Sequence, residues 1–356
     1  MKKFIILLFL SFSTIQVYAF ENLVYTLRGF PGDLTQGTIA IQDLKKHASQ
    51  INILSSQAYS IDDKGIVVGT LNTQMVQIAK NAHIKQMPLV ANTHFAPEFV
   101  HTFLHDKAAQ DRAIKSLLML CKQNQFEGIQ IDFEGMSFLD KDDFTQFYQN
   151  ISNQFHTNGF KIAIAIVPVL TDSPPETAYL RGRYEKWTGV YDYKKLGESS
   201  DFVTLMAYDH HGGITPPGPM AGITWDKAII EYALKFIPPE KISLGTPWRV
   251  GYWYTGRNTE SSAHSLGSIE VDLSYEDAMR LLNDNHITTQ WNDEDKVHFA
   301  IYRNHFLYEY MYLEDVDSFR AKVDLVTKYK LRGVSNWCLG GEDPRIWDLL
   351  AKLSNN

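Results

Sequence analysis

Two acidic residues stand two positions apart at the end of the apolar segment 126–134. If this segment is a β-strand, alternate side chains point to opposite faces, so Gln130, Asp132 and Glu134 share one face. Two carboxyl groups this close change each other's proton affinity, so one stays protonated as a general acid while the other stays charged. Cleavage of a glycosidic bond needs this combination. We favour this interpretation over a solvated strand end because the opposite face of the segment is wholly apolar.

Short apolar segments recur along the chain with helix-like segments between them, which is typical of a parallel sheet built from β then α units. Most are continuously apolar, as strands covered on both faces are. Strands are predicted at residues 23–27, 51–57, 87–91, 128–132, 161–167, 202–206, 242–247 and 333–337. Eight such units predict an α/β fold, a closed (β/α)8 or TIM barrel, with its active site at the carboxyl ends of the strands.

Two connections are longer than a barrel requires. Residues 168–193, rich in Pro, Tyr and charge, follow the fifth strand and are expected to form part of a cleft wall. Residues 250–312, between the seventh and eighth strands, contain a predicted helix at 275–283 and alternating segments at 298–302 and 306–312. We therefore predict a small α+β insertion on the active face of the barrel. Sequence alone does not decide whether its aromatic residues 252–254 line the cleft or pack the insertion.

Residues 1–19 combine two lysines, an apolar run and a small-residue cleavage pattern that ends at Ala19. This is typical of a secretory signal peptide, so we expect residues 20–356 to be a catalytic barrel that is secreted or periplasmic. No later stretch is apolar and long enough to span a membrane. The formal net charge of −7 does not favour nucleic acid as a partner. The two cysteines, Cys121 and Cys338, are predicted to lie at opposite ends of the fold, unpaired, buried and inert.

The sequence resembles glycoside hydrolase family 18, the chitinase-like group, whose fourth-strand motif has the form D-G-x-D-x-D-x-E. Residues 127–134 match it, with both final acids intact and with Glu127 and Gln130 in place of the commoner Asp. The resemblance continues through Met206-Ala207-Tyr208-Asp209, through residues 242–247 and through residues 331–344. Residues 218–221 and 238–242 look especially like the bacterial branch that includes spore cortex-lytic N-acetylglucosaminidases, in which an amide often stands at the place of Gln130.

The resemblance implies a retaining, substrate-assisted mechanism in which the 2-acetamido oxygen of the sugar is the nucleophile. Glu134 would be the general acid and base, Asp132 would orient the acetamido group and Tyr208 would bond its carbonyl. The substrate-binding residues would be Gln130, Met206, Asp209, Arg249 and Trp337, with Trp337 as the apolar floor under the sugar. For Asp209 and Arg249 a surface ion pair is an equally good interpretation. We expect Gln130 to donate a hydrogen bond to Asp132 and hold it ionised.

These residues predict a monomeric hydrolase of β-linked N-acetylglucosamine in peptidoglycan or chitin. An endo-β-N-acetylglucosaminidase acting on protein-linked glycans is the alternative enzyme, and a chitinase-like lectin is the alternative from another class. The retained Glu134 favours an enzyme, because a lectin needs no acid there. We expect no cofactor and no metal, because the adjacent His210 and His211, like His94, lack the spacing of metal ligands.

Overall fold

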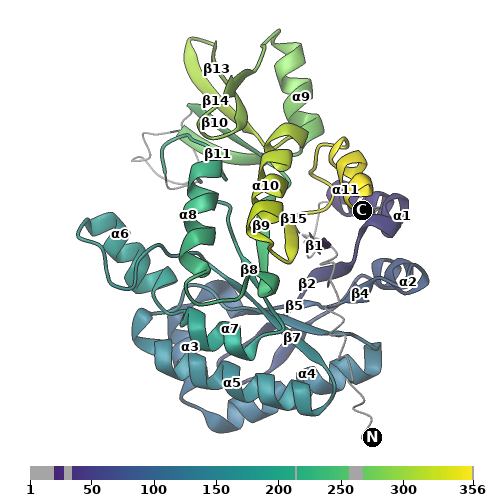
Figure 1. Ribbon diagram of the computed structural model, residues 1–356, viewed down its shortest axis with the longest axis vertical. Helices are drawn as coiled ribbons and strands as arrows, with labels where there is room; N and C mark the ends of the chain where they lie inside the picture. Colours follow the sequence, from purple (N-terminus) through teal and green to yellow (C-terminus); the bar gives the residue numbers. More distant parts are fainter. Residues whose placement is uncertain (1–19, 28–33, 213–214, 256–267, 355–356) are drawn as a thin grey trace, which may run out of the picture.

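Eight parallel strands form a sheet that closes on itself where β1 pairs with β2 (Figure 1). The computed structural model describes residues 20–27, 34–212, 215–255 and 268–354, so the predicted signal peptide 1–19 lies outside the described residues. The barrel strands are β1 (Glu21–Thr26), β2 (Ile53–Ile61), β5 (Leu89–Asn92), β6 (Gly128–Asp132), β7 (Lys161–Ile166), β8 (Phe202–Leu205), β9 (Ile242–Pro247) and β15 (Gly333–Trp337). The predicted (β/α)8 barrel is confirmed, and the short strands β3 (Val67–Gly69) and β4 (Lys85–Gln86) pair with β2 beside it.

Helices surround the barrel and begin and end where local chemistry dictates. They are α1 (Leu34–Lys46), α2 (Thr73–Asn81), α3 (Pro97–Leu104), α4 (Lys107–Asn124), α5 (Lys141–Thr157), α6 (Ala178–Arg183), α7 (Tyr193–Ser199), α8 (Ile223–Ala233), α10 (Val316–Tyr329) and α11 (Ile346–Ser354). In α4, the Asp106 carboxylate accepts hydrogen bonds from the first free backbone N–H groups, and Gln125 ends the helix in the left-handed conformation. None of the helices within the described ranges has the length and apolar content needed to cross a bilayer.

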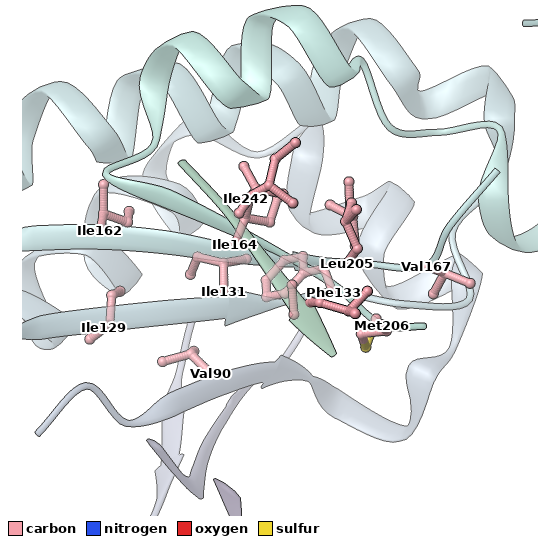
Figure 2. Packing of buried hydrophobic residues seen from close by; sticks show 14 of the residues in the cluster. Val90, Ile129, Ile131, Phe133, Ile162, Ile164, Val167, Leu205, Met206 and Ile242 are labelled. Carbon is pink, nitrogen blue, oxygen red and sulfur yellow. The ribbon is translucent and has the colours of Figure 1, made fainter. Parts of the chain in front are cut away.

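The apolar face of β6 packs outward against the helices. Ile129, Ile131 and Phe133 are buried there among side chains from β7, β8 and β9 (Figure 2). The Phe133 ring lies 6.1 Å from the ring of Phe103 on α3 and 6.0 Å from the ring of Phe147 on α5, measured between ring centroids. Aromatic pairs at these distances attract each other in addition to excluding water. This packing fixes the end of β6, where the two acidic residues stand.

The interior of the barrel contains a hydrogen-bonded layer of polar side chains. The Tyr25 hydroxyl donates to Oε1 of Gln130 at 2.8 Å, and Nε2 of Gln130 donates to the Thr204 hydroxyl at 3.0 Å. Thr204 and Ser335 lie 3.0 Å apart, and Ser335 and Ser243 lie 2.7 Å apart, oxygen to oxygen. The bonds of Gln130 and the bond between Thr204 and Ser335 join strands that are not neighbours in the sheet, so they cross the barrel, while Ser335 and Ser243 stand on the neighbouring strands β15 and β9. A buried polar group without a partner is costly, and this network supplies partners to each of these side chains.

The connection between β9 and β15 forms the predicted α+β insertion. Its antiparallel sheet contains β10 (Val250–Thr255), β11 (Ser268–Leu273), β12 (Gln290–Asn292), β13 (Val297–Asn304) and β14 (Leu307–Leu313), and its helix is α9 (Tyr275–Asp284). Ala278 and Leu282 of α9 pack on one face of the sheet, and the whole unit stands at one end of the molecule (Figure 1). Trp253 is 1% exposed and the Tyr252 hydroxyl donates to Glu309, so these two aromatic residues pack the insertion.

Gly128, at the start of β6, allows a close approach between two backbones. A Cβ added there would lie 1.9 Å from the carbonyl oxygen of Lys161 on β7, which is part of the sheet and has no room to move. Only glycine avoids this clash.

We therefore expect Gly128→Ala to lower the free energy of unfolding by about 1–3 kcal/mol, because relief of the clash must distort the β6–β7 pairing. Urea denaturation measures this. Gly182→Ala is the matched control, since a Cβ there meets no atom within 4 Å, and it should be neutral or slightly stabilising. Equal stability of the two variants would contradict the close-approach argument.

Candidate active site

A cleft of about 670 Å³ lies at the carboxyl ends of the barrel strands. Asp132 ends β6, Glu134 follows it by two residues, and both line the cleft. Other lining side chains come from β1, from the residues after β8, from β15 and from the connection after β7: Tyr25, Met206, Tyr208, Asp209, Trp337, Tyr179, Arg183, Lys186 and Trp187. The expectation that residues 168–193 form part of a cleft wall agrees with this arrangement.

The backbone around Glu134 is held from two sides. The side chain of Asn92, which ends β5, accepts a hydrogen bond from the backbone N–H of Glu134 at 2.8 Å and donates one to its carbonyl at 2.9 Å. The Tyr191 hydroxyl donates to the carbonyl of Phe133 at 2.8 Å. Gly135 follows with φ of +67°, in the left-handed region, and a Cβ there would lie 2.4 Å from the carbonyl oxygen of Phe95. Glu134 therefore leaves the strand in one defined direction.

The two carboxyl groups have a raised affinity for protons. Burial raises the pKa of Asp132 to about 7, and its Oδ1 atom has no hydrogen-bond partner among the described residues. Burial also raises the pKa of Glu134, and the charge of Asp132 raises it further. A hydrogen bond from Trp187 and the charge of Arg183 act in the opposite direction without cancelling the rise. Glu134 therefore has the properties of a general acid that retains its proton at mildly acidic pH.

Two aromatic rings form the base of the cleft. The rings of Tyr208 and Trp337 are stacked with their centroids 6.4 Å apart, and the Tyr25 ring packs against Trp337 at 5.4 Å. Gly245 of β9 gives Tyr208 its space, since a Cβ there would lie 2.9 Å from the Tyr208 ring. The peptide bond between Trp337 and Cys338 is cis. An apolar ring of this kind fits the C–H face of a pyranose.

The remaining predicted substrate-binding residues lie in two places. Met206 and Asp209 line the cleft. Arg249 is not among the lining residues and instead forms an ion pair with Asp209, with a second ion pair of 3.1 Å from Nε to the carboxylate of Asp272 on β11. The ion pair between Asp209 and Arg249 is present, although Arg249 is largely buried, and Arg249 connects the loop after β8 to the insertion.

The expectation for Gln130 was wrong. Its amide bonds Tyr25, Thr204 and Ser55, not Asp132, and it does not line the cleft because its side chain is fully buried in the polar layer. Gln130 donates and accepts hydrogen bonds within that layer. An uncharged amide can do both without adding a buried charge.

The cysteines are both free, as expected, although Cys338 is only partly buried while Cys121 is fully buried. Burial raises the pKa of both thiols to about 12, which disfavours the reactive thiolate.

Among the described residues, one group of side chains has the spacing of metal ligands, formed by His298, Asp315 and Asp317. Asp315 already accepts the backbone N–H groups of Asp317 and Ser318 as the N-cap of α10, and it bonds Nδ1 of His298 at 2.6 Å. Helix capping explains this group without a metal.

Several residues of the site were not found from the sequence. Asn92, Trp187, Arg183 and Lys186 belong to segments without a recognisable motif. A polar residue at the end of the buried strand β5 was a usable signal for Asn92, because barrel active sites collect such residues.

The fold and the site together define a class of protein. A closed (β/α)8 barrel carries a pair of desolvated carboxyl groups above an aromatic base, in a cleft large enough for sugar rings. This is the arrangement of a glycoside-cleaving enzyme.

Comparison with known proteins identifies the family. The sequence profile described as glycosyl hydrolases family 18 matches residues 3–342, so the chain belongs to this family. A cortical fragment-lytic enzyme of Bacillus subtilis (strain 168) is 27% identical over 329 residues, covering 88% of this chain and 71% of that enzyme.

Solved structures share the fold. The spore cortex-lytic enzyme SleL of Bacillus megaterium QM B1551 is 24% identical with a TM-score of 0.79, covering 93% of this chain and 73% of SleL. A chitinase of Chromobacterium violaceum ATCC 12472 is 21% identical with a TM-score of 0.80, covering 95% of this chain and 99% of the chitinase.

We expect Asn92→Ala to lower kcat by about 10- to 100-fold with a smaller change in KM, because Glu134 loses both bonds that fix its backbone. Steady-state kinetics on an N-acetylglucosamine oligomer measures this. Thr93→Ala is the matched control, since the Thr93 hydroxyl bonds the carbonyl of Ile61 and not Glu134. If both variants lose the same activity, general loosening of the loop explains the effect and Asn92 has no positioning role.

Proposed function

We propose that this family 18 glycosidase is an exported, monomeric, retaining hydrolase that cleaves β-linked N-acetylglucosamine in peptidoglycan or chitin with the help of the substrate's acetamido group. The observation that carries the proposal is the placement of Asp132 and Glu134, which both line the cleft from the same face of β6, with Asp132 buried and Glu134 half-buried. Because both carboxyl groups approach from one strand, Asp132 is not placed across the sugar from Glu134, where a protein nucleophile would stand.

In the first step the proton of Glu134 passes to the glycosidic oxygen as the bond from that oxygen to C1 breaks. The acetamido oxygen of the same sugar forms a bond to C1 and gives a cyclic oxazolinium ion, with retention as the final outcome. Asp132 orients the acetamido N–H and stabilises the positive charge. The Tyr208 hydroxyl, whose pKa is raised by burial, remains a donor to the acetamido carbonyl.

In the second step Glu134, now a carboxylate, takes a proton from water as the water oxygen attacks C1 and the oxazolinium ring opens. Trp337 supports the apolar face of the sugar throughout. Relatives named as cortex-lytic enzymes and chitinases support a bacterial wall polymer or chitin as substrate. Export rests on the signal-peptide pattern of residues 1–19.

Product analysis with purified peptidoglycan, chitin oligomers and a high-mannose glycopeptide tests the function. We expect new reducing ends from one of the first two substrates, and loss of product in Glu134→Gln without loss of folding. Cleavage of the glycopeptide alone would favour an endo-β-N-acetylglucosaminidase, and binding without any product would favour a lectin.

The pH dependence of kcat/KM tests the role of Glu134. A general acid is active while protonated, so activity should fall as pH rises through the pKa of Glu134, which lies above the ordinary glutamate value of 4.5. In Asp132→Asn the neighbouring charge is absent, so the pKa of Glu134 should fall and the basic limb of the residual activity should move to lower pH. Asp111→Asn, which removes an exposed acid on α4, is the control and should leave the limb in place. An unmoved limb in Asp132→Asn would argue against the acid assignment.

A further inference from the structure

One wall of the cleft is a single helical face. Helix α6 continues directly into a π-helical turn, Tyr184–Thr188, and residues along this segment line the cleft at helical spacing. Positions three, four, seven and eight residues apart lie on one side of a helix. The residues concerned, which we name the basic wall, are Tyr179, Gly182, Arg183, Lys186 and Trp187.

The two cations of the basic wall have no acidic partner. Among the described residues, neither Arg183 nor Lys186 forms an ion pair, although the chain has a net charge of −7. Other arginines nearby are occupied, since Arg249 pairs with two aspartates and Arg181 bonds the backbone carbonyls of residues 175 and 176. Two cations directed into a cleft without a protein partner are available to a ligand.

The acids of the cleft do not neutralise this wall. Asp209 is already paired with Arg249. Burial raises the pKa of both Asp132 and Glu134, which reduces the negative charge they carry near neutral pH. Arg183 nevertheless lies close enough for its charge to lower the pKa of Glu134 and of His210. The positive charge of the wall therefore extends to the point of cleavage.

We propose that Arg183 and Lys186 bind carboxylate groups carried by the sugar polymer, so that the substrate is an anionic strand of β-linked N-acetylhexosamines, as in peptidoglycan, and not neutral chitin. This inference rests on the function proposed above and selects between its two substrates. The planar guanidinium of Arg183 matches a carboxylate with two parallel hydrogen bonds, and the Lys186 ammonium adds a point charge. Tyr179 and Trp187 flank the cations with faces on which a sugar packs.

The carboxylate has two chemical sources in such a polymer, the lactyl ether of the sugar and the attached peptide. Three substrates separate them: strands stripped of peptide so that the lactyl carboxylates are free, the same strands with these carboxylates converted to neutral amides, and strands that keep their peptides. The first two substrates differ only in whether the lactyl group ends in a carboxylate or in its neutral amide.

For the wild-type protein we expect kcat/KM on the free-carboxylate strands or on the peptide-bearing strands to exceed that on the amidated strands by about 10- to 100-fold. In the double variant Arg183→Gln, Lys186→Gln this ratio should fall to about 1, because a carboxylate then gains no ionic partner. Lys85→Gln is the matched control. Lys85 belongs to β4, which pairs with the first residues of β2 at the opposite end of the barrel, so this variant should keep the wild-type ratio.

Arg183 also affects the proton affinity of Glu134, so its loss alters the rate on every substrate. The ratio between charged and amidated strands, measured at several pH values, separates the two effects because a change in Glu134 alone moves both rates together. Binding to Glu134→Gln gives a second readout, in which the preference for charged strands should weaken as salt rises.

Each result decides the proposal. A wild-type preference for charged strands that is lost in the double variant supports it. Equal cleavage of charged and amidated strands, or a preference that survives in the double variant, contradicts carboxylate binding by the basic wall. Either result leaves the proposed hydrolase activity unaffected. Absence of product from every strand and from chitin overturns the proposed function and this inference with it.

Discussion

Desolvation of two carboxyl groups at the end of one barrel strand is the constraint on which the rest of the structure depends. Asp132 is 4% exposed and shares its strand face with Glu134, so neither carboxyl group is fully solvated. Burial disfavours the ionised form of a carboxyl group, so the group tends to keep its proton. A general acid requires this protonated state. The same burial that is unfavourable for folding therefore favours the protonated state that the proposed mechanism needs.

Other parts of the fold keep this arrangement rigid. Phe133 anchors the outer side of the strand end among aromatic rings of α3 and α5, and Asn92 fixes the backbone of Glu134. Below the acids, the amide of Gln130 joins β1, β2 and β8 through one hydrogen-bonded layer. A neutral residue at this level supports the acid pair without adding a third charge to a buried region.

The sequence was sufficient for the barrel because continuous apolar segments define its strands, and all eight are present. It was also sufficient to find Asp132 and Glu134, since alternation along a strand places both on one face. The hydrogen bonds of Gln130 were mispredicted because they cross the barrel to β1 and β8, and sequence spacing contains no information on partners across a closed sheet. Asn92 was missed because it acts on Glu134 from a different βα unit, and residues 168–193 were expected in the cleft wall without the cations of the basic wall being singled out.

The central claim is that the acetamido oxygen of the substrate, and not Asp132, attacks the sugar. The most direct measurement compares kcat/KM for aryl oligomers whose reacting sugar carries an acetyl, fluoroacetyl, difluoroacetyl or trifluoroacetyl group on nitrogen. Fluorine withdraws electron density from the carbonyl oxygen, so the rate should fall steeply along this series if that oxygen is the nucleophile. A rate that stays level along the series would show that the protein supplies the nucleophile and would contradict the account.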